Sequence, residues 1–299
     1  MPFVRIASLL PAATEIVGAL GLGDALAAVT FECDEPAGIR ERCPVVVDTA
    51  LAHGMDPAEI DRTVRERAAA GLGMYDLDRD ALARIDPDLI LTQDLCRVCA
   101  LPQASVEEAQ SSIGTRARVL SLDPHGLGDV FAAIHDVGAA TGATAAAHEL
   151  VGGLERRLDA VAAAVAGRPV PRVLVLEWTD PPFLPGHWVP ELVSRAGGEA
   201  VGAIPGGRSV AVEWEALPEP VDAVLVAPCG FGLDDAVTQA SAVRERLPAG
   251  VPVTALDSAS FVVRAGPRLV DGIEAIAWAL HPDAVPEPPP GRVASVPAP

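Results

Sequence analysis

The chain has 299 residues, and its 22 basic against 41 acidic side chains give a net charge of −19. At roughly 150 residues per domain, this length predicts two domains or one large one. Half of the residues are apolar and 21% are charged, which argues against intrinsic disorder. No apolar run approaches the ~20 residues that cross a bilayer. The acidic excess without a basic stretch excludes nucleic acids and anionic membrane surfaces as expected partners and favours a small or cationic ligand, or a protein.

The first part of the chain alternates short β-branched or apolar runs with helical patterns, which is typical of an α/β fold with parallel strands. We predict helices over residues 14–20, 57–70 and 78–85, and strands over residues 4–10, 26–31, 45–47, 89–92 and 119–122. Residues 1–125 are therefore expected to form an N-terminal α/β lobe.

The middle of the chain is helical over residues 126–168. A first helix is predicted over 126–140, and after Thr141 and Gly142 a second, Ala-rich helix runs over 143–166 without proline. At 1.5 Å per residue, about 24 residues span roughly 36 Å, enough to run along two lobes. The second helix is therefore expected to be a rigid connector.

The α/β alternation resumes after this connector. Strands are predicted over 173–177, 223–227 and 253–256, and helices over 189–195, 234–247 and 267–280. Residues 169–281 should form a C-terminal α/β lobe. Residues 282–299 are rich in proline with little to bury, which predicts a disordered tail.

Four of the five cysteines follow predicted strands, where ligands bind in open parallel sheets. They are Cys33, Cys96, Cys99 and Cys229, whereas Cys43 precedes its strand. Cys96 and Cys99 have the CxxC spacing that allows two thiolates to reach one metal centre. The four thiols are candidate ligands of an iron–sulfur cluster or zinc. Alternatively, they are buried apolar side chains.

The most polar loop expected at the ligand-binding edge follows the strand over 173–177. Its aromatic side chains offer flat surfaces for stacking on a planar ligand, and its polar side chains could contact that ligand. The aromatic residues are Trp178, Phe183 and Trp188, and the polar residues are Glu177, Asp180 and His187. The alternative is that these aromatic residues close the base of the second lobe. Residues 206–209 could form an anion nest or a flexible loop. No Walker loop, GxSxG elbow or HExxH motif is present, so no catalytic residues are assigned.

Three segments resemble the substrate-binding proteins for cobalamin and iron-siderophores. They are residues 5–23, with RIASLLPAATE and LGLG, residues 86–90, with DPDLI, and residues 264–272, with RAGPRLVDG. The resemblance implies a helical-backbone metal receptor fold, in which two α/β lobes joined by one long helix hold a metal chelate in their cleft. The segments FECDEP, TQDLCRVCA, LEWTDPPF, GHWVPE and APCGF resemble a subgroup of cobalamin-binding proteins. Phe31 stands where this subgroup commonly has histidine.

Three hypotheses follow. The first is a non-catalytic binding protein that holds cobalamin or another corrinoid in the cleft between the lobes. The second is a metalloprotein whose four cysteines hold an iron–sulfur cluster or zinc. The third is a sensor or scaffold without a ligand. The N-terminal residues lack a signal-peptide pattern, so a cytoplasmic location is expected. The resemblance allows an ABC permease as partner, whereas the missing signal argues against one.

Overall fold

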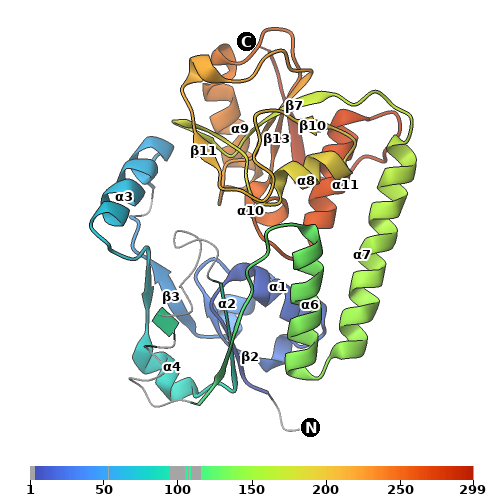
Figure 1. Ribbon diagram of the computed structural model, residues 1–299. Helices are drawn as coiled ribbons and strands as arrows, with labels where there is room; N and C mark the ends of the chain where they lie inside the picture. Colours follow the sequence, from blue (N-terminus) through green and yellow to red (C-terminus); the bar gives the residue numbers. More distant parts are fainter. Residues whose placement is uncertain (1–3, 53, 94–104, 107, 109–115, 299) are drawn as a thin grey trace. The chain divides into compact units, whose positions relative to one another are not determined.

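The computed structural model describes residues 4–52, 54–93, 105–106, 108 and 116–298. The chain divides into two compact units (Figure 1). Unit 1 comprises Met1–Pro124 and Phe131–Val151, and unit 2 comprises His125–Val130 and Gly152–Pro299. Sequence analysis placed the lobe boundaries on either side of a separate helical segment. In the structure the division between the units falls within both helices of that segment, after Val130 and after Val151.

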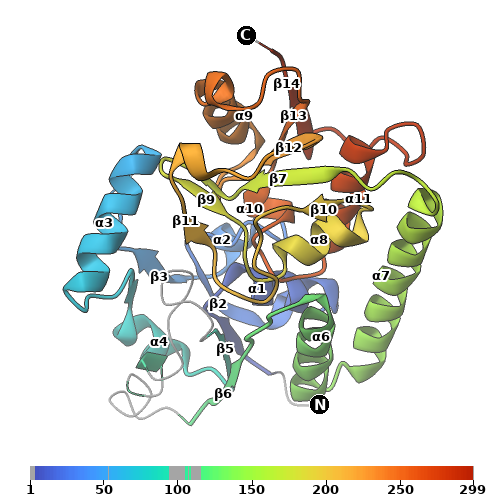
Figure 2. The same cartoon turned by 45° about the horizontal axis from the view of Figure 1, so that its top comes forward.

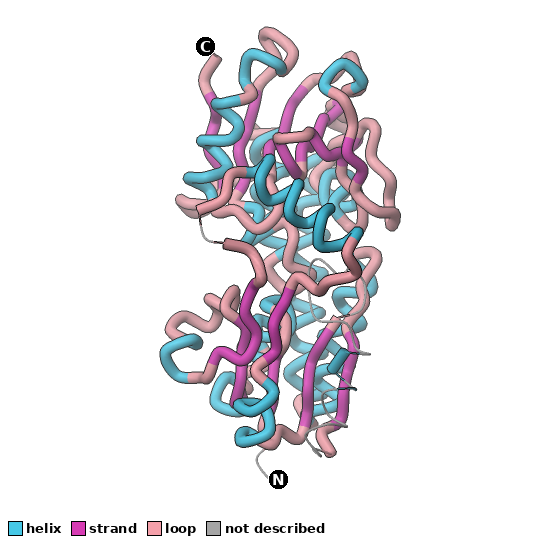
Figure 3. Tube along the Cα trace, turned by 90° about the vertical axis from the view of Figure 1, so that its left-hand side faces the viewer, coloured by secondary structure: helices cyan, strands magenta, loops and turns pink. Residues whose placement is uncertain are grey.

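Unit 1 contains a six-stranded sheet with the order β4-β3-β2-β1-β5-β6, in which only the β3–β4 pair is antiparallel. Figure 3 shows these strands side by side. Their bounds are β1 Ile6–Ser8, β2 Leu26–Thr30, β3 Val45–Thr49, β4 Tyr75–Leu77, β5 Leu89–Thr92 and β6 Arg118–Ser121. The mainly parallel α/β fold predicted from the sequence is confirmed. The edge strand β4 was not predicted, because three partly exposed residues carry no readable alternation.

Unit 1 contains helices α1 Pro11–Ala19, α2 Ile39–Arg42, α3 Pro57–Ala69 and α4 Arg79–Ile85, with a 3-10 turn, η1, over Gly23–Ala25. Two of these helices, α3 and α4, begin at capping aspartates, Asp56 and Asp78. Asp56 and Glu59 form a reciprocal capping box at the start of α3. Helix α1 begins three residues before the predicted start, because Pro11 fits the first turn of a helix, where its missing N–H costs nothing.

Helices α6 (Leu127–Thr141) and α7 (Thr144–Val165) form an antiparallel hairpin (Figures 1 and 2). Gly142 separates them with a φ of 77°, in the left-handed region that favours glycine. A Cβ atom on Gly138 would lie 2.6 Å from the Cβ atom of Ala147, so the helices touch closely at this point. Helix α7 covers all but the first and last residues of the long helix predicted over 143–166, so that prediction is confirmed.

Unit 2 contains a five-stranded sheet with the order β10-β7-β12-β13-β14. The bounds are β7 Arg172–Leu176, β10 Glu199–Ala200, β12 Ala223–Val226, β13 Val253–Leu256 and β14 Val293–Val296. All neighbouring strands are parallel except β13 and β14. Strand β14 lies within the segment expected to be a disordered tail. It forms because its backbone pairs with β13 and Val296 is buried (Figure 2).

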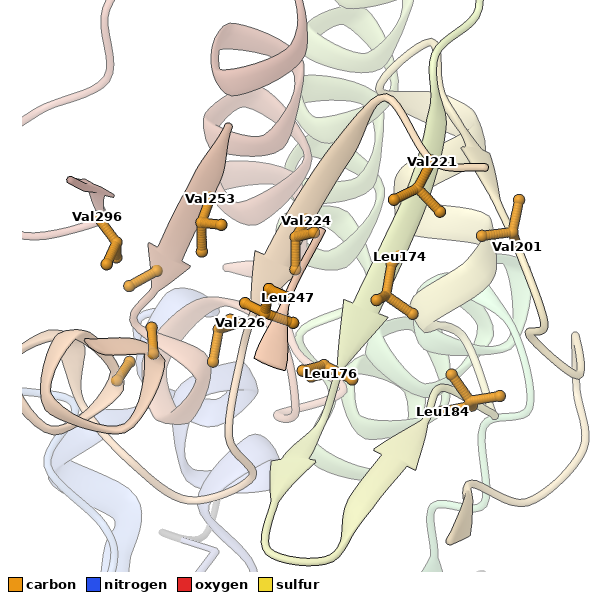
Figure 4. Packing of buried hydrophobic residues seen from close by; sticks show 13 residues of the cluster. Leu174, Leu176, Leu184, Val201, Val221, Val224, Val226, Leu247, Val253 and Val296 are labelled. Carbon is orange, nitrogen blue, oxygen red and sulfur yellow. The ribbon is translucent and has the colours of Figure 1, made fainter. Parts of the chain in front are cut away.

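One cluster of the core of unit 2 lies on one face of this sheet (Figure 4). Leu174 and Leu176 of β7, and Val224 and Val226 of β12, are two residues apart and therefore point to the same face. The other elements of the unit are α8 Val189–Arg195, α9 Leu233–Ala242, α10 Ser258–Phe261, α11 Leu269–Leu280 and the 3-10 turns η2 Trp214–Ala216 and η3 Arg244–Arg246. Helix α9 ends five residues before its predicted end, because the chain tightens into η3.

A small antiparallel sheet with the order β11-β9-β8 follows β7 in unit 2. Its strands are β8 Trp178–Thr179, β9 Pro182–Leu184 and β11 Val210–Ala211. Sequence analysis treated this segment as a loop, because strands of two or three residues give no periodic signal. The sheet fixes the positions of Trp178 and Phe183, and Glu177 and Asp180 lie next to its strands.

An ion network joins α7, α11 and the C-terminal segment of unit 2. Arg157 donates two hydrogen bonds to Glu274, at 2.8 and 2.7 Å, and one to Asp271 at 2.7 Å. Arg292 lies 3.0 Å from Asp271. We expect Arg157→Ala to lower the free energy of unfolding by about 1 to 2 kcal/mol, because bidentate bonds between charged, partly buried groups are lost.

Urea denaturation tests this prediction. Arg156→Ala is the matched control, since Arg156 is the exposed neighbour in sequence and should change stability by less than about 0.5 kcal/mol. Equal losses in the two variants would show that the network contributes nothing.

Candidate functional site

The β8–β9 hairpin directly follows β7 at the carboxyl-end edge of the sheet in unit 2. Trp178 pairs with Phe183 across this hairpin, so the two rings share one face. The backbone N–H of Glu177 donates to the carbonyl of Phe183 at 3.0 Å. Asp180 is exposed in the turn. The structure thus brings together four of the side chains that the sequence singled out.

Phe231 adds a third aromatic ring to this edge. Its ring centroid lies 5.6 Å from that of Trp178, at an interplanar angle of 51°. The indole N–H of Trp178 donates to the carbonyl of Asp180 at 3.1 Å. Trp178, Phe183 and Phe231 are half-buried. Phe231 was not among the predicted site residues. Its place in the loop after β12 would have revealed it by the strand-end rule, by which ligands bind beyond the carboxyl ends of parallel strands.

Trp188 has a different environment from Trp178. It is only 7% exposed, and its indole N–H donates to the carbonyl of Val262 at 2.8 Å. A buried indole with a satisfied N–H group is a packing residue. This placement favours the interpretation that Trp188 closes the base of the second lobe.

The carboxyl group of Glu177 is buried at this edge, with 8% of the residue exposed. The Ser209 hydroxyl and the backbone N–H of Gly186 donate hydrogen bonds to it. Burial raises the pKa of Glu177 from 4.5 to about 7, and the two hydrogen bonds limit the rise. Glu177 can therefore hold or release a proton near neutral pH.

His187 is held by the loop over residues 206–209. The backbone N–H of His187 donates to the carbonyl of Gly207 at 2.6 Å, and the backbone carbonyl of His187 accepts from the N–H of Gly206 at 2.9 Å. Burial lowers the pKa of the imidazole, and electrostatic repulsion from the nearby His125 and Arg208 side chains lowers it further. The imidazole is therefore neutral at pH 7, the state that can ligate a metal or accept a hydrogen bond. The loop that could have been an anion nest instead braces His187 and Glu177.

The described cysteines occupy different environments. Cys33, in unit 1, is buried, with its sulfur 3.0 Å from the Thr14 hydroxyl. Cys229, in unit 2, is exposed. Cys43 is buried and donates to the carbonyl of Leu26 at 3.1 Å, and burial raises its pKa. Cys96 and Cys99 lie outside the described residues.

The residues that the structure describes contain neither a cluster of three metal ligands nor a membrane-spanning helix. In that part of the chain, no group of three or more His, Cys, Asp or Glu side chains could hold a metal ion. The hypothesis of a cysteine-ligated cluster or zinc therefore gains no support. None of the helices in the described ranges is both long and apolar enough to span a bilayer.

Comparison with known proteins identifies the family. Residues 6–249 match the sequence model of the family described as periplasmic binding protein. The chain belongs to this family. The resemblance to substrate-binding proteins is thereby confirmed at the level of the family, and the chain is a ligand-binding protein of this type. No curated protein matches it significantly.

Solved structures of periplasmic binding proteins share this fold. A periplasmic heme-binding protein from Pseudomonas aeruginosa is 21% identical, with 98% of each chain covered and a TM-score of 0.70. The periplasmic vitamin B12 binding protein BtuF of Vibrio cholerae is 21% identical, covering 92% of this chain and 96% of its own, with a TM-score of 0.63. An ABC transporter substrate-binding protein from Listeria monocytogenes is 17% identical, covering 91% and 98%, with a TM-score of 0.64.

Proposed function

We propose that this chain binds a planar metal chelate of the tetrapyrrole type, a cobalamin or related corrinoid, at the carboxyl-end edge of the sheet in unit 2. The observation that carries the proposal is the pairing of Trp178 with Phe183, next to Phe231, as half-buried rings at that edge. Half-buried aromatic surface is what a macrocycle covers on binding. Two structural neighbours, which bind heme and vitamin B12, support this ligand class.

The polar groups around the rings have complementary roles in this proposal. Corrinoid side chains are amides, which donate hydrogen bonds to carboxylates such as Asp180 and Glu177. His187 is a neutral imidazole that could accept a hydrogen bond or ligate the metal. A porphyrin carries carboxylates instead, which the positive charge of Arg208 would attract. Because corrinoids and porphyrins need different polar partners, separate titrations of the protein with a member of each class distinguish them.

The test is titration of the purified protein with cyanocobalamin and, separately, with hemin, followed by visible absorbance and calorimetry. We expect one equivalent of cobalamin to bind. Trp178→Ala should weaken binding at least about tenfold, because it removes a stacking surface worth more than about 1.4 kcal/mol. Trp214→Phe is the matched control, since Trp214 contacts Arg246 elsewhere in unit 2 and should leave the affinity unchanged.

Each other outcome contradicts part of the proposal. Binding of hemin but not cobalamin would replace the corrinoid with a porphyrin. Absence of both a spectral change and calorimetric heat with either compound would overturn the tetrapyrrole class. Equal affinities of the wild type and Trp178→Ala would overturn the placement of the ligand on the aromatic rings.

We also propose that the chain delivers its ligand to an ABC permease, as the neighbour from Listeria monocytogenes supports. This role requires the protein outside the cytoplasm or at the membrane surface, whereas sequence analysis predicted a cytoplasmic location. Cell fractionation with immunoblotting distinguishes the two, since recovery only in the cytosol would contradict the permease.

A further inference from the structure

Two histidines of unit 1 face each other across the α6–α7 hairpin. His135 lies on α6 and is half-buried, and His148 lies on α7 and is exposed. Their ring centroids are 4.7 Å apart, at an interplanar angle of 49°. Nothing in the proposed ligand binding uses this pair.

The backbone of the hairpin holds the pair in place. The inner faces of the two helices are buried at Ile134, Val137 and Ala147. A Cβ atom on Gly138 would clash with Ala147, so the two helices pack closely at this point. His135 lies one turn before Gly138, and His148 immediately follows Ala147. Rigid helices, not loops, therefore set the separation of the rings.

This separation fits coordination of one ion by both rings. Zinc–nitrogen bonds are about 2.0–2.1 Å, and an imidazole centroid lies about 1.1 Å behind its nitrogen, so each centroid is about 3.2 Å from the ion. Two rings bound at angles of about 90–110° then have centroids about 4.5–5.2 Å apart. The observed 4.7 Å falls within this interval.

We propose that His135 and His148 form a binding site for a divalent transition metal such as nickel, copper or zinc. Imidazole nitrogen suits these ions. Of the residues one turn away on the same helices, Ala132, Ala139 and Thr144 are small and exposed, so water molecules can complete the coordination from that side. Among the described residues no third His, Cys, Asp or Glu joins the pair, so the site is open. A bound ion would tie α6 to α7.

The test uses nickel(II) chloride with protein stripped of metal by a chelator. We expect calorimetry to show a binding event in the wild type that His135→Ala and His148→Ala weaken at least about tenfold. Removing a residue that only hydrogen-bonds to a metal ligand already lowers metal affinity by about tenfold or more. Glu149→Gln is the matched control, because Glu149 is the exposed neighbour of His148 and is not a proposed ligand. Nickel should also raise the unfolding temperature of the wild type and of Glu149→Gln only, since ligands stabilise the state that they bind.

The comparison between variants separates this site from the thiols. Nickel bound at cysteines would remain in both histidine variants, so unchanged titrations would overturn the proposal and leave the rings as a packing contact. Absence of nickel binding by the wild type at millimolar concentration would also overturn it. His148 is exposed, so His148→Ala should keep its helical circular dichroism and decides the question if His135→Ala unfolds.

Discussion

Replacing Glu177 by glutamine is expected to make the protein more stable above neutral pH and to abolish part of its pH dependence. Burial raises the pKa of this carboxyl group from 4.5 to about 7 in the folded chain. Between these values the folded chain keeps a proton that the unfolded chain releases. Stability therefore falls as pH rises through this window, and the loss is complete above pH 7. The difference between the two pKa values corresponds to a loss of about 3 kcal/mol in the free energy of unfolding.

The amide of Glu177→Gln has the same shape as the protonated acid and never ionises. Its oxygen can still accept from the Ser209 hydroxyl and the Gly186 N–H. We expect the variant to match the wild type near pH 5 and to exceed its free energy of unfolding by up to about 3 kcal/mol at pH 8. Urea denaturation from pH 5 to pH 8 measures the difference.

The free energies of unfolding of the wild type and of Glu177→Gln must be compared at each pH, because His187 changes the stability with pH in the opposite direction. Its pKa is lowered in the folded chain, so its contribution is lost as pH falls. The contribution of His187 is the same in the wild type and in Glu177→Gln, so it cancels when one curve is subtracted from the other. Glu213→Gln is the matched control, since Glu213 is an exposed glutamate of unit 2 and its variant should follow the wild-type curve. Parallel curves for the wild type and Glu177→Gln would show that the carboxyl group is not desolvated.

The sequence predicted this edge of unit 2 because the strand-end rule depends only on the position of β7. The run over residues 173–177 is apolar and β-branched, so the strand and the loop that follows it were both readable. The rule could not tell Trp178 from Trp188. The two tryptophans differ only in tertiary surroundings: one pairs across a hairpin, and the other donates to a carbonyl 74 residues away.

Two other features depend on pairings between distant segments that no local pattern encodes. Strand β14 comes from a proline-rich segment and exists because its backbone hydrogen-bonds to β13. The buried environment of Glu177 depends on Ser209, 32 residues further along the chain. A window of sequence around either segment contains neither partner, so the sequence predicted a disordered tail in the first case and a polar contact with a ligand in the second.

Replacing Gly186 by alanine is expected to damage both stability and the environment of Glu177. The space that a Cβ atom would need at this position is filled by backbone atoms of Gly207, Arg208 and Ser209. Backbone cannot rotate away as a side chain can, so the loop over residues 206–209 must move. Overpacking of this kind costs about 2 to 3 kcal/mol. Moving the loop also separates the Ser209 hydroxyl from the carboxylate.

The two effects give independent readings of one substitution. Loss of the Ser209 hydrogen bond removes a contact that lowers the pKa of Glu177, so the pH window of the stability loss should extend above 7 in Gly186→Ala. Gly128→Ala is the matched control, because nothing lies within 4 Å of the added methyl group near the start of α6. Its stability should be unchanged or slightly raised, since alanine favours helix over glycine. If Gly186→Ala unfolds at the same urea concentration as Gly128→Ala, the loop is not packed against residue 186. A stability loss without a shifted pH window would mean that Ser209 follows the loop and keeps its contact with Glu177.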